Sequence, residues 1–148
     1  GNAIYVGETT SEQFATGSGL QPMRRGDSDI FIAKLTTAGA VQFITYLGGL
    51  AFDTGLGVTT DSSNNIYLTG ITNSPDFPTK NPIPQTAYSH GNSCTSASPC
   101  DFDAFAAKIS ADGQTLMFSS YLGGSGYDYG NGIALDPTGS LWVGGWTT

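Results

Sequence analysis

Charged residues are scarce in this sequence. Five Lys and Arg and twelve Asp and Glu among 148 residues give a formal net charge of −7. Proteins that bind nucleic acids usually carry a surplus of Lys and Arg that neutralises phosphates, so this balance excludes a nucleic-acid partner. No run of apolar residues approaches the ~20 residues that a membrane-spanning helix needs, so we also expect no membrane insertion.

The usual signatures of catalysis are also missing. The sequence has no Gly-x-Ser-x-Gly elbow, no phosphate-binding loop and no second histidine that could join His90 in a metal site. We therefore expect no enzymatic activity and no transition-metal site. Pairs of Asp could in principle act as acid and base in a glycosidase-like site, but no pair stands out from the others.

Cysteine occurs only twice, as Cys94 and Cys100 in the polar segment NSCTSASPC. Their spacing does not match that of a zinc-ligand pair, and the remaining ligands are missing. In an exported protein, a disulfide that closes a small surface loop is the better interpretation. Such a bond would contribute roughly 2 kcal/mol by restricting the unfolded chain.

Apolar residues at helical spacing are missing too, so helix content should be minimal. A repeat is present instead. Residues 46–49 read Tyr-Leu-Gly-Gly and recur at 121–124, and an Asp follows four residues after each copy, at Asp53 and Asp128. Self-similarity at a fixed period is the sequence signature of a repeat architecture.

Short apolar runs rich in Val, Ile, Phe, Tyr and Thr, bounded by Gly, Asp or Asn, predict β-strands. Several of these runs recur together with the Tyr-Leu-Gly-Gly marker, and tight turns such as Ser110-Ala-Asp-Gly113 join them. The predicted strands are 3–7, 30–35, 41–47, 56–61, 66–72, 103–109, 115–122, 132–136 and 141–147.

Four consecutive antiparallel strands per repeat are typical of a β-propeller blade. We therefore predict an all-β fold made of four-stranded antiparallel blades, with about two blades present. Residues 1–55 form a partial blade with strands two to four. Residues 56–131 form a complete blade with a long insertion at 79–102, and residues 132–148 begin a third blade.

The repeat resembles the bacterial seven-bladed beta-propeller (SBBP) repeat. Three segments and their partner copies carry the resemblance: DAFAAKISADG, LMFSSYLGGSGYDYGNGIALD and NNIYLTGITNSPDFPT. The resemblance implies a secreted or cell-surface bacterial protein built on a propeller scaffold. It brings no catalytic residues with it.

Two blades are too few to close a propeller, which typically has about 4–8 blades. Open apolar blade faces are rare on soluble monomers, so we expect flanking blades or further copies of the chain to cover them. Because the two ends differ, this contact should be head to tail. The sequence thus favours an extracellular structural or scaffold module, part of a longer array, ring or fibre. The alternative is a propeller that binds glycans or proteins through rim loops 15–28 and 79–102.

The repeated Asp residues are a candidate metal site. Asp53 and Asp128 could each supply oxygen ligands to calcium, once per blade, and calcium is the one cofactor that the sequence leaves open. The alternative role is structural: each side chain accepts backbone N–H bonds within its own turn.

The aromatic residues near the end of the sequence are a candidate ligand platform. Tyr127, Tyr129, Trp142 and Trp146 could present their rings to a sugar. The alternative is aromatic packing between blades.

Overall fold

The computed structural model describes residues 1–15, 17–84 and 101–148. These residues form strands and no helix. The strands are β1 (Ala3–Thr9), β2 (Asp29–Leu35), β3 (Val41–Leu47), β4 (Asp53–Thr60), β5 (Ile66–Thr72), β6 (Asp103–Ile109), β7 (Leu116–Leu122), β8 (Asp128–Leu135) and β9 (Leu141–Thr147).

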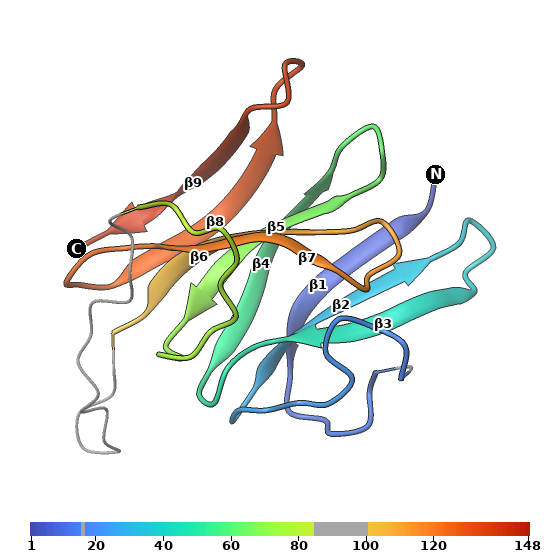
Figure 1. The fold of residues 1–148 in the computed structure, drawn as a ribbon, viewed down its shortest axis with the longest axis horizontal. Helices are drawn as coiled ribbons and strands as arrows, with labels where there is room; N and C mark the ends of the chain where they lie inside the picture. The colour runs from blue at the N-terminus through green and yellow to red at the C-terminus, as the bar shows by residue number, and fades with distance from the viewer. Residues whose placement is uncertain (16, 85–100) are drawn as a thin grey trace.

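The strands belong to three antiparallel sheets. The first has the order β1-β2-β3, the second β4-β5-β6-β7 and the third β8-β9. Figure 1 shows the sheets following one another, from the blue first sheet to the red third sheet, with the two termini on opposite sides. Within each sheet, strands that are neighbours in sequence pair with each other, which is the meander expected of propeller blades. The all-β prediction is confirmed.

The first strands of the second and third sheets begin earlier than the sequence suggested. We expected them at residues 56 and 132, but β4 begins at Asp53 and β8 at Asp128. Gly55 and Gly57 lie inside the strand and form a bulge, because the register shifts between them and the strand then continues. The third sheet has the same shift at the equivalent glycines. A bulge absorbs one extra residue without ending a strand.

The hydrophobic core lies between the first and second sheets. Buried side chains of β2 and β3 join those of β5, β6 and β7 in one cluster. Its fully or almost fully buried members are Ile30, Ile32, Phe43, Leu47, Ile66, Leu68, Phe77, Phe105, Ala107, Ile109 and Tyr121. Two sheets thus bury one apolar face each by packing against each other, which neither could do alone.

Candidate functional site

The Tyr-Leu-Gly-Gly segment lies between two buried carboxylates where the first sheet meets the second. Asp29 is the first residue of β2, Asp53 is the first of β4, and both are fully buried. The backbone at Gly48 passes between them. A Cβ atom placed on Gly48 would lie 2.6 Å from Cγ of Asp29 and 2.8 Å from Oδ2 of Asp53. Glycine is therefore needed here because a side chain would collide with both carboxylates.

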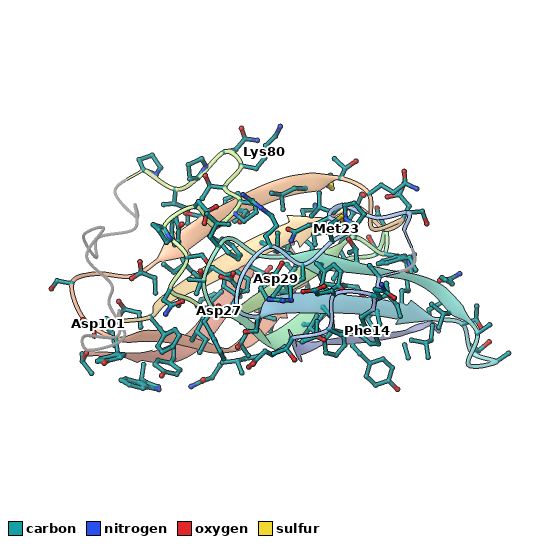
Figure 2. The ribbon with its side chains drawn as sticks, turned by 90° about the horizontal axis from the view of Figure 1, so that it is seen from below. Phe14, Met23, Asp27, Asp29, Lys80 and Asp101 are labelled. Atoms are coloured by element: carbon teal, nitrogen blue, oxygen red, sulfur yellow. The ribbon has the colours of Figure 1, made fainter. Side chains whose placement is uncertain are left out.

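Asp29 ties the preceding segment to the start of β2. Gln21 Nε2 donates to Oδ2 of Asp29 over 2.5 Å, and the backbone N–H of Arg25 donates to the same oxygen over 3.0 Å. The N–H of Gly26 donates to Oδ1 over 3.0 Å. Figure 2 shows Asp29 near the middle of the molecule, whereas Lys80 lies at its edge. Both oxygens of this buried carboxylate accept hydrogen bonds, as burial of a polar group requires.

Asp53 holds together the turn that joins the two sheets. The N–H of Gly49 and the hydroxyl of Ser74 each donate to Oδ2 of Asp53 over 2.8 Å. The pKa of the carboxyl is raised from 3.8 to about 6, mainly because burial disfavours the charged form. Hydrogen bonds from Thr72, Gly49 and Ser74 act in the opposite direction, and the nearby Asp29 adds a smaller raising effect. The folded protein thus binds this proton more tightly than the unfolded chain.

The same arrangement recurs where the second sheet meets the third. Asp103 begins β6 and Asp128 begins β8, and both are buried. A Cβ atom on Gly123 would overlap Oδ1 of Asp103 and lie 2.9 Å from Oδ2 of Asp128. The N–H of Gly124 donates to Oδ2 of Asp128 over 2.8 Å. One pair of buried carboxylates therefore marks each junction between sheets.

Sequence reasoning selected one Asp of each pair and missed the other. Asp53 and Asp128 were candidates because they follow the repeated marker, whereas Asp29 and Asp103 come from a different strand of the preceding sheet. A signal was available: both copies of the third strand begin with Asp.

Calcium at Asp53 and Asp128 remains a prediction. The described surroundings of both residues match the structural alternative, because backbone N–H groups donate to their Oδ2 atoms. Among the residues that the structure describes, no group of three or more His, Cys, Asp or Glu side chains is arranged to hold a metal ion. A calcium ion would have to draw its remaining ligands from carbonyl oxygens or water.

The aromatic candidates separate into two places. Tyr129 and Trp146 face each other across β8 and β9, with stacked rings 4.5 Å apart at 12°. Trp142 lies further along β9 opposite Ala134, and its Nε1 donates to Oδ2 of Asp136 over 3.3 Å. Trp142 therefore does not belong to the same cluster.

Phe102, which sequence reasoning missed, links the remaining rings. Its centroid lies 6.5 Å from that of Tyr127 and 6.1 Å from that of Tyr129. Phe52 extends the row, 6.4 Å from Phe102. The signal for this row is an aromatic residue directly before a buried Asp, which occurs at 52–53, 102–103 and 127–128. We call Phe52, Phe102, Tyr127, Tyr129 and Trp146 the aromatic row.

Two repeat-equivalent lysines have different partners. Lys34 is buried, and its Nζ donates over 2.7 Å to the carbonyl oxygen of Ala111, in the turn between β6 and β7. Lys108 pairs with Asp61 over 3.3 Å and lies over the ring of Tyr67, 4.8 Å from its centroid. The first contact crosses from one sheet to the next, whereas the second stays within the second sheet.

A groove of about 450 Å³ separates part of the second sheet from the third. Side chains of β5, β6, β7 and β9 line it, together with one residue that follows β5. They are Tyr67, Ile83, Ala106, Lys108, Phe118, Leu122, Leu141 and Val143. All but Lys108 are apolar or aromatic, so the groove suits an apolar occupant better than a small polar ligand.

Three residues considered in the sequence lie outside the described part of the chain: His90, Cys94 and Cys100. The proposed disulfide therefore remains a prediction. No helix in the described ranges is long and apolar enough to cross a membrane.

The fold and the repeated junctions together define an all-β, propeller-type repeat protein. The model of the SBBP beta-propeller repeat matches residues 42–78 and 118–148. These two segments belong to the SBBP repeat family, which confirms the resemblance drawn from the sequence. Each match begins in strand four of one sheet, at β3 or β7, and runs through the carboxylate junction into the next sheet. A search of curated proteins found no match.

Proposed function

We propose that this chain is a non-enzymatic extracellular structural module whose blades stack, through flanking blades or further copies of the chain, into an array, ring or fibre. The observation that carries the proposal is the interface between the first and second sheets. There, apolar faces are buried, Lys34 bonds to the facing turn, and the N–H of Leu20 donates to the carbonyl oxygen of Gly113 over 2.8 Å.

A single blade has apolar residues on both of its faces. A sheet with apolar residues on both faces exposes one of them unless a neighbour covers each side. Exposed apolar residues remain on the outer strands, among them Tyr5 of β1 and Trp142 of β9. A module built to be stacked on both sides accounts for these residues at both ends of the series of sheets.

Secretion or a cell-surface location is part of the same proposal. It is supported by the family resemblance. Protease treatment of intact cells that express the native protein should digest it, while a cytoplasmic marker survives. Protection of the protein until the cells are lysed would contradict an extracellular location.

Light scattering tests the stacking. The purified chain should gain mass as its concentration rises, because each end offers an apolar face and the head-to-tail contact does not close on itself. A single species of 15.3 kDa at all concentrations would contradict self-association. In that case the apolar faces would have to be covered by flanking blades.

Binding of glycans or proteins is the second candidate function. The aromatic row supports it, because Trp146, stacked on Tyr129, and Tyr127, beside Phe102, keep part of their surface exposed. A glycan array tests it, with a Trp146→Ala variant to localise the signal. Equal binding by both proteins, or binding by neither, would contradict a role for the row. No cofactor is proposed beyond the possible calcium, which calcium titration followed by calorimetry would detect.

A further inference from the structure

The last strand of each of the first two sheets has one edge that no strand of its own sheet covers. β3 ends the order β1-β2-β3, and β7 ends the order β4-β5-β6-β7. Backbone N–H and C=O groups on such an edge are a template for pairing with another chain. In both blades the segment that follows strand two returns to this edge. Residues 19–22 reach β3, and residues 80–84 reach β7.

Residues 80–84 bond to the outer edge of β7. The N–H of Lys80 donates to the carbonyl oxygen of Ser119 over 3.0 Å, and the N–H of Ser119 donates back to the carbonyl oxygen of Lys80 over 2.8 Å. The N–H of Ile83 donates to the hydroxyl of Ser120 over 3.1 Å. Ser119 and Ser120 are fully buried although they lie in the last strand of the sheet. This segment therefore covers the edge at its centre.

Residues 19–22 make the equivalent contact with β3. The N–H of Tyr46 donates to the carbonyl oxygen of Gln21 over 3.0 Å. The N–H of Gln21 donates to the hydroxyl of Thr45 over 2.9 Å, as that of Ile83 does to Ser120. Gln21 and Thr45 are both buried. Two insertions that differ in sequence thus perform the same task at the same repeat position.

Both segments end in a residue that cannot extend the pairing. A proline directly follows the residue that bonds to the edge hydroxyl, since Pro22 follows Gln21 and Pro84 follows Ile83. Proline has no N–H, so it cannot donate to a further strand on the outside.

The neighbouring residues are also unsuited to strand addition. In the first blade the N–H of Leu20 donates to the carbonyl oxygen of Gly113, in the turn between β6 and β7, over 2.8 Å. In the second blade Asn81 has a φ of 47°, so the chain leaves the extended conformation between Lys80 and Pro82. A strand that approached either segment from outside would meet an interrupted row of donors.

We propose that residues 19–22 and 80–84 are edge caps, whose function is to block the addition of a foreign strand to β3 and β7. Capped blades associate through their faces, whereas molecules that lie side by side do not merge into one continuous sheet. This function is separate from the stacking proposed above, because the caps act on strand edges and stacking acts on sheet faces. Either can fail without the other.

Hydrogen exchange in the full chain tests the cap on β7. Lys80→Pro removes the N–H that Ser119 accepts and places a ring against the edge, whereas the matched control Lys80→Ala keeps that N–H. The amide of Ser119 should exchange roughly tenfold faster in Lys80→Pro than in Lys80→Ala, because it loses its acceptor when the cap is displaced. Equal exchange in the two folded variants would overturn the proposal.

Lateral association is the second readout, measured by thioflavin T at equal concentrations of each protein. Lys80→Pro should bind more dye than the native chain or Lys80→Ala, because strands added at a free edge build a cross-strand sheet and stacked blade faces do not. No increase, or an increase that Lys80→Ala shares, would overturn the proposal.

A double variant tests the prolines while the cap stays in place. Pro82→Ala combined with Pro84→Ala restores two N–H groups on the segment, so it should also bind more dye than the native chain. Pro137→Ala, in the turn between β8 and β9, is the matched control and should not. Dye binding by the double variant that does not exceed that of Pro137→Ala would overturn the proposal. If Lys80→Pro does not fold, this comparison decides alone.

Discussion

The hydroxyl of Tyr121 donates a hydrogen bond over 2.7 Å to the carbonyl oxygen of Ser74, although 47 residues separate them. The same hydroxyl accepts the N–H of Phe77 over 3.1 Å. Tyr46 makes the two equivalent bonds, of 2.7 and 2.8 Å, to segment 11–14. The tyrosine that begins the Tyr-Leu-Gly-Gly marker lies in strand four of each blade. In both blades it forms hydrogen bonds with the loop that follows strand two.

Removing this hydroxyl should weaken the blade. We predict that Tyr121→Phe lowers the free energy of unfolding by about 1–3 kcal/mol, because a backbone donor and a backbone acceptor lose their partner in a buried place. Urea denaturation followed by fluorescence measures it. Tyr5→Phe is the control, since Tyr5 is 55% exposed, and it should change stability by less than ~0.5 kcal/mol. Equal effects of the two variants would contradict a structural role for the marker tyrosine.

The two glycines of the second marker should differ in their tolerance of a side chain. Gly123→Ala puts a methyl group against Asp103 and Asp128, so it should cost about 1–3 kcal/mol or more. Nothing lies within 4 Å of a Cβ atom on Gly124, so Gly124→Ala should be close to neutral. Thermal melts measure both effects, and Gly123→Ala should melt at a lower temperature than Gly124→Ala. The opposite order would contradict the close packing of Gly123 against the two carboxylates.

Asp53 should make stability depend on pH. Its pKa is about 6 in the folded protein and 3.8 as the ordinary value, because burial disfavours the charged form. The resulting stabilisation is fully present below about pH 3.8 and is lost as the pH rises through about 6. The carboxyl therefore favours the folded state in acid and loses this effect near neutrality.

Asp53→Asn removes this titration. Between about pH 4 and pH 7 the native protein should lose up to ~3 kcal/mol relative to the variant, since tenfold in proton affinity corresponds to about 1.4 kcal/mol. Denaturation curves at several pH values measure the difference. Asp27→Asn, at an exposed carboxylate, serves as the control for the loss of one negative charge. A constant difference for Asp53→Asn would contradict the raised pKa.

The two cysteines should be bonded to each other in the exported protein. Alkylation under native conditions followed by mass measurement should find Cys94 and Cys100 unmodified until a reductant is added. Reduction should leave the melting of the blades nearly unchanged, because both residues lie in the insertion between strands two and three. Two freely alkylated thiols in the exported protein would end the disulfide interpretation.

Much of the fold could be predicted because strands repeat with their turns. The predicted strands 66–72, 103–109 and 41–47 agree with β5, β6 and β3. The starts of β4 and β8 could not be predicted from glycine content, because glycine permits a bulge as readily as a turn.

The site was harder to predict than the fold because its members come from different sheets. The partner of Asp53 is Asp29, and the starts of β2 and β4 meet through a backbone hydrogen bond from the N–H of Asp53 to the carbonyl oxygen of Ser28, which strand patterns do not reveal. Nearness in sequence was also misleading for Trp142 and Trp146. Four residues along a strand separate two side chains by about 13 Å, so they cannot form one platform.

The interface between the first two sheets is filled, whereas the equivalent space between the second and third sheets is open at the groove. Phe43 and Phe118 occupy the same repeat position at these two interfaces. Phe43 is 4% exposed in the core, whereas Phe118 lines the groove.

The most direct measurement compares Phe43→Leu with Phe118→Leu in the 148-residue chain, kept dilute enough to be monomeric. Phe43→Leu should lower the free energy of unfolding by about 1–2 kcal/mol, because it leaves a space in a filled core. Phe118→Leu should lower it by less than ~0.5 kcal/mol, because its side chain borders an open groove. Equal losses in the two variants would contradict the account.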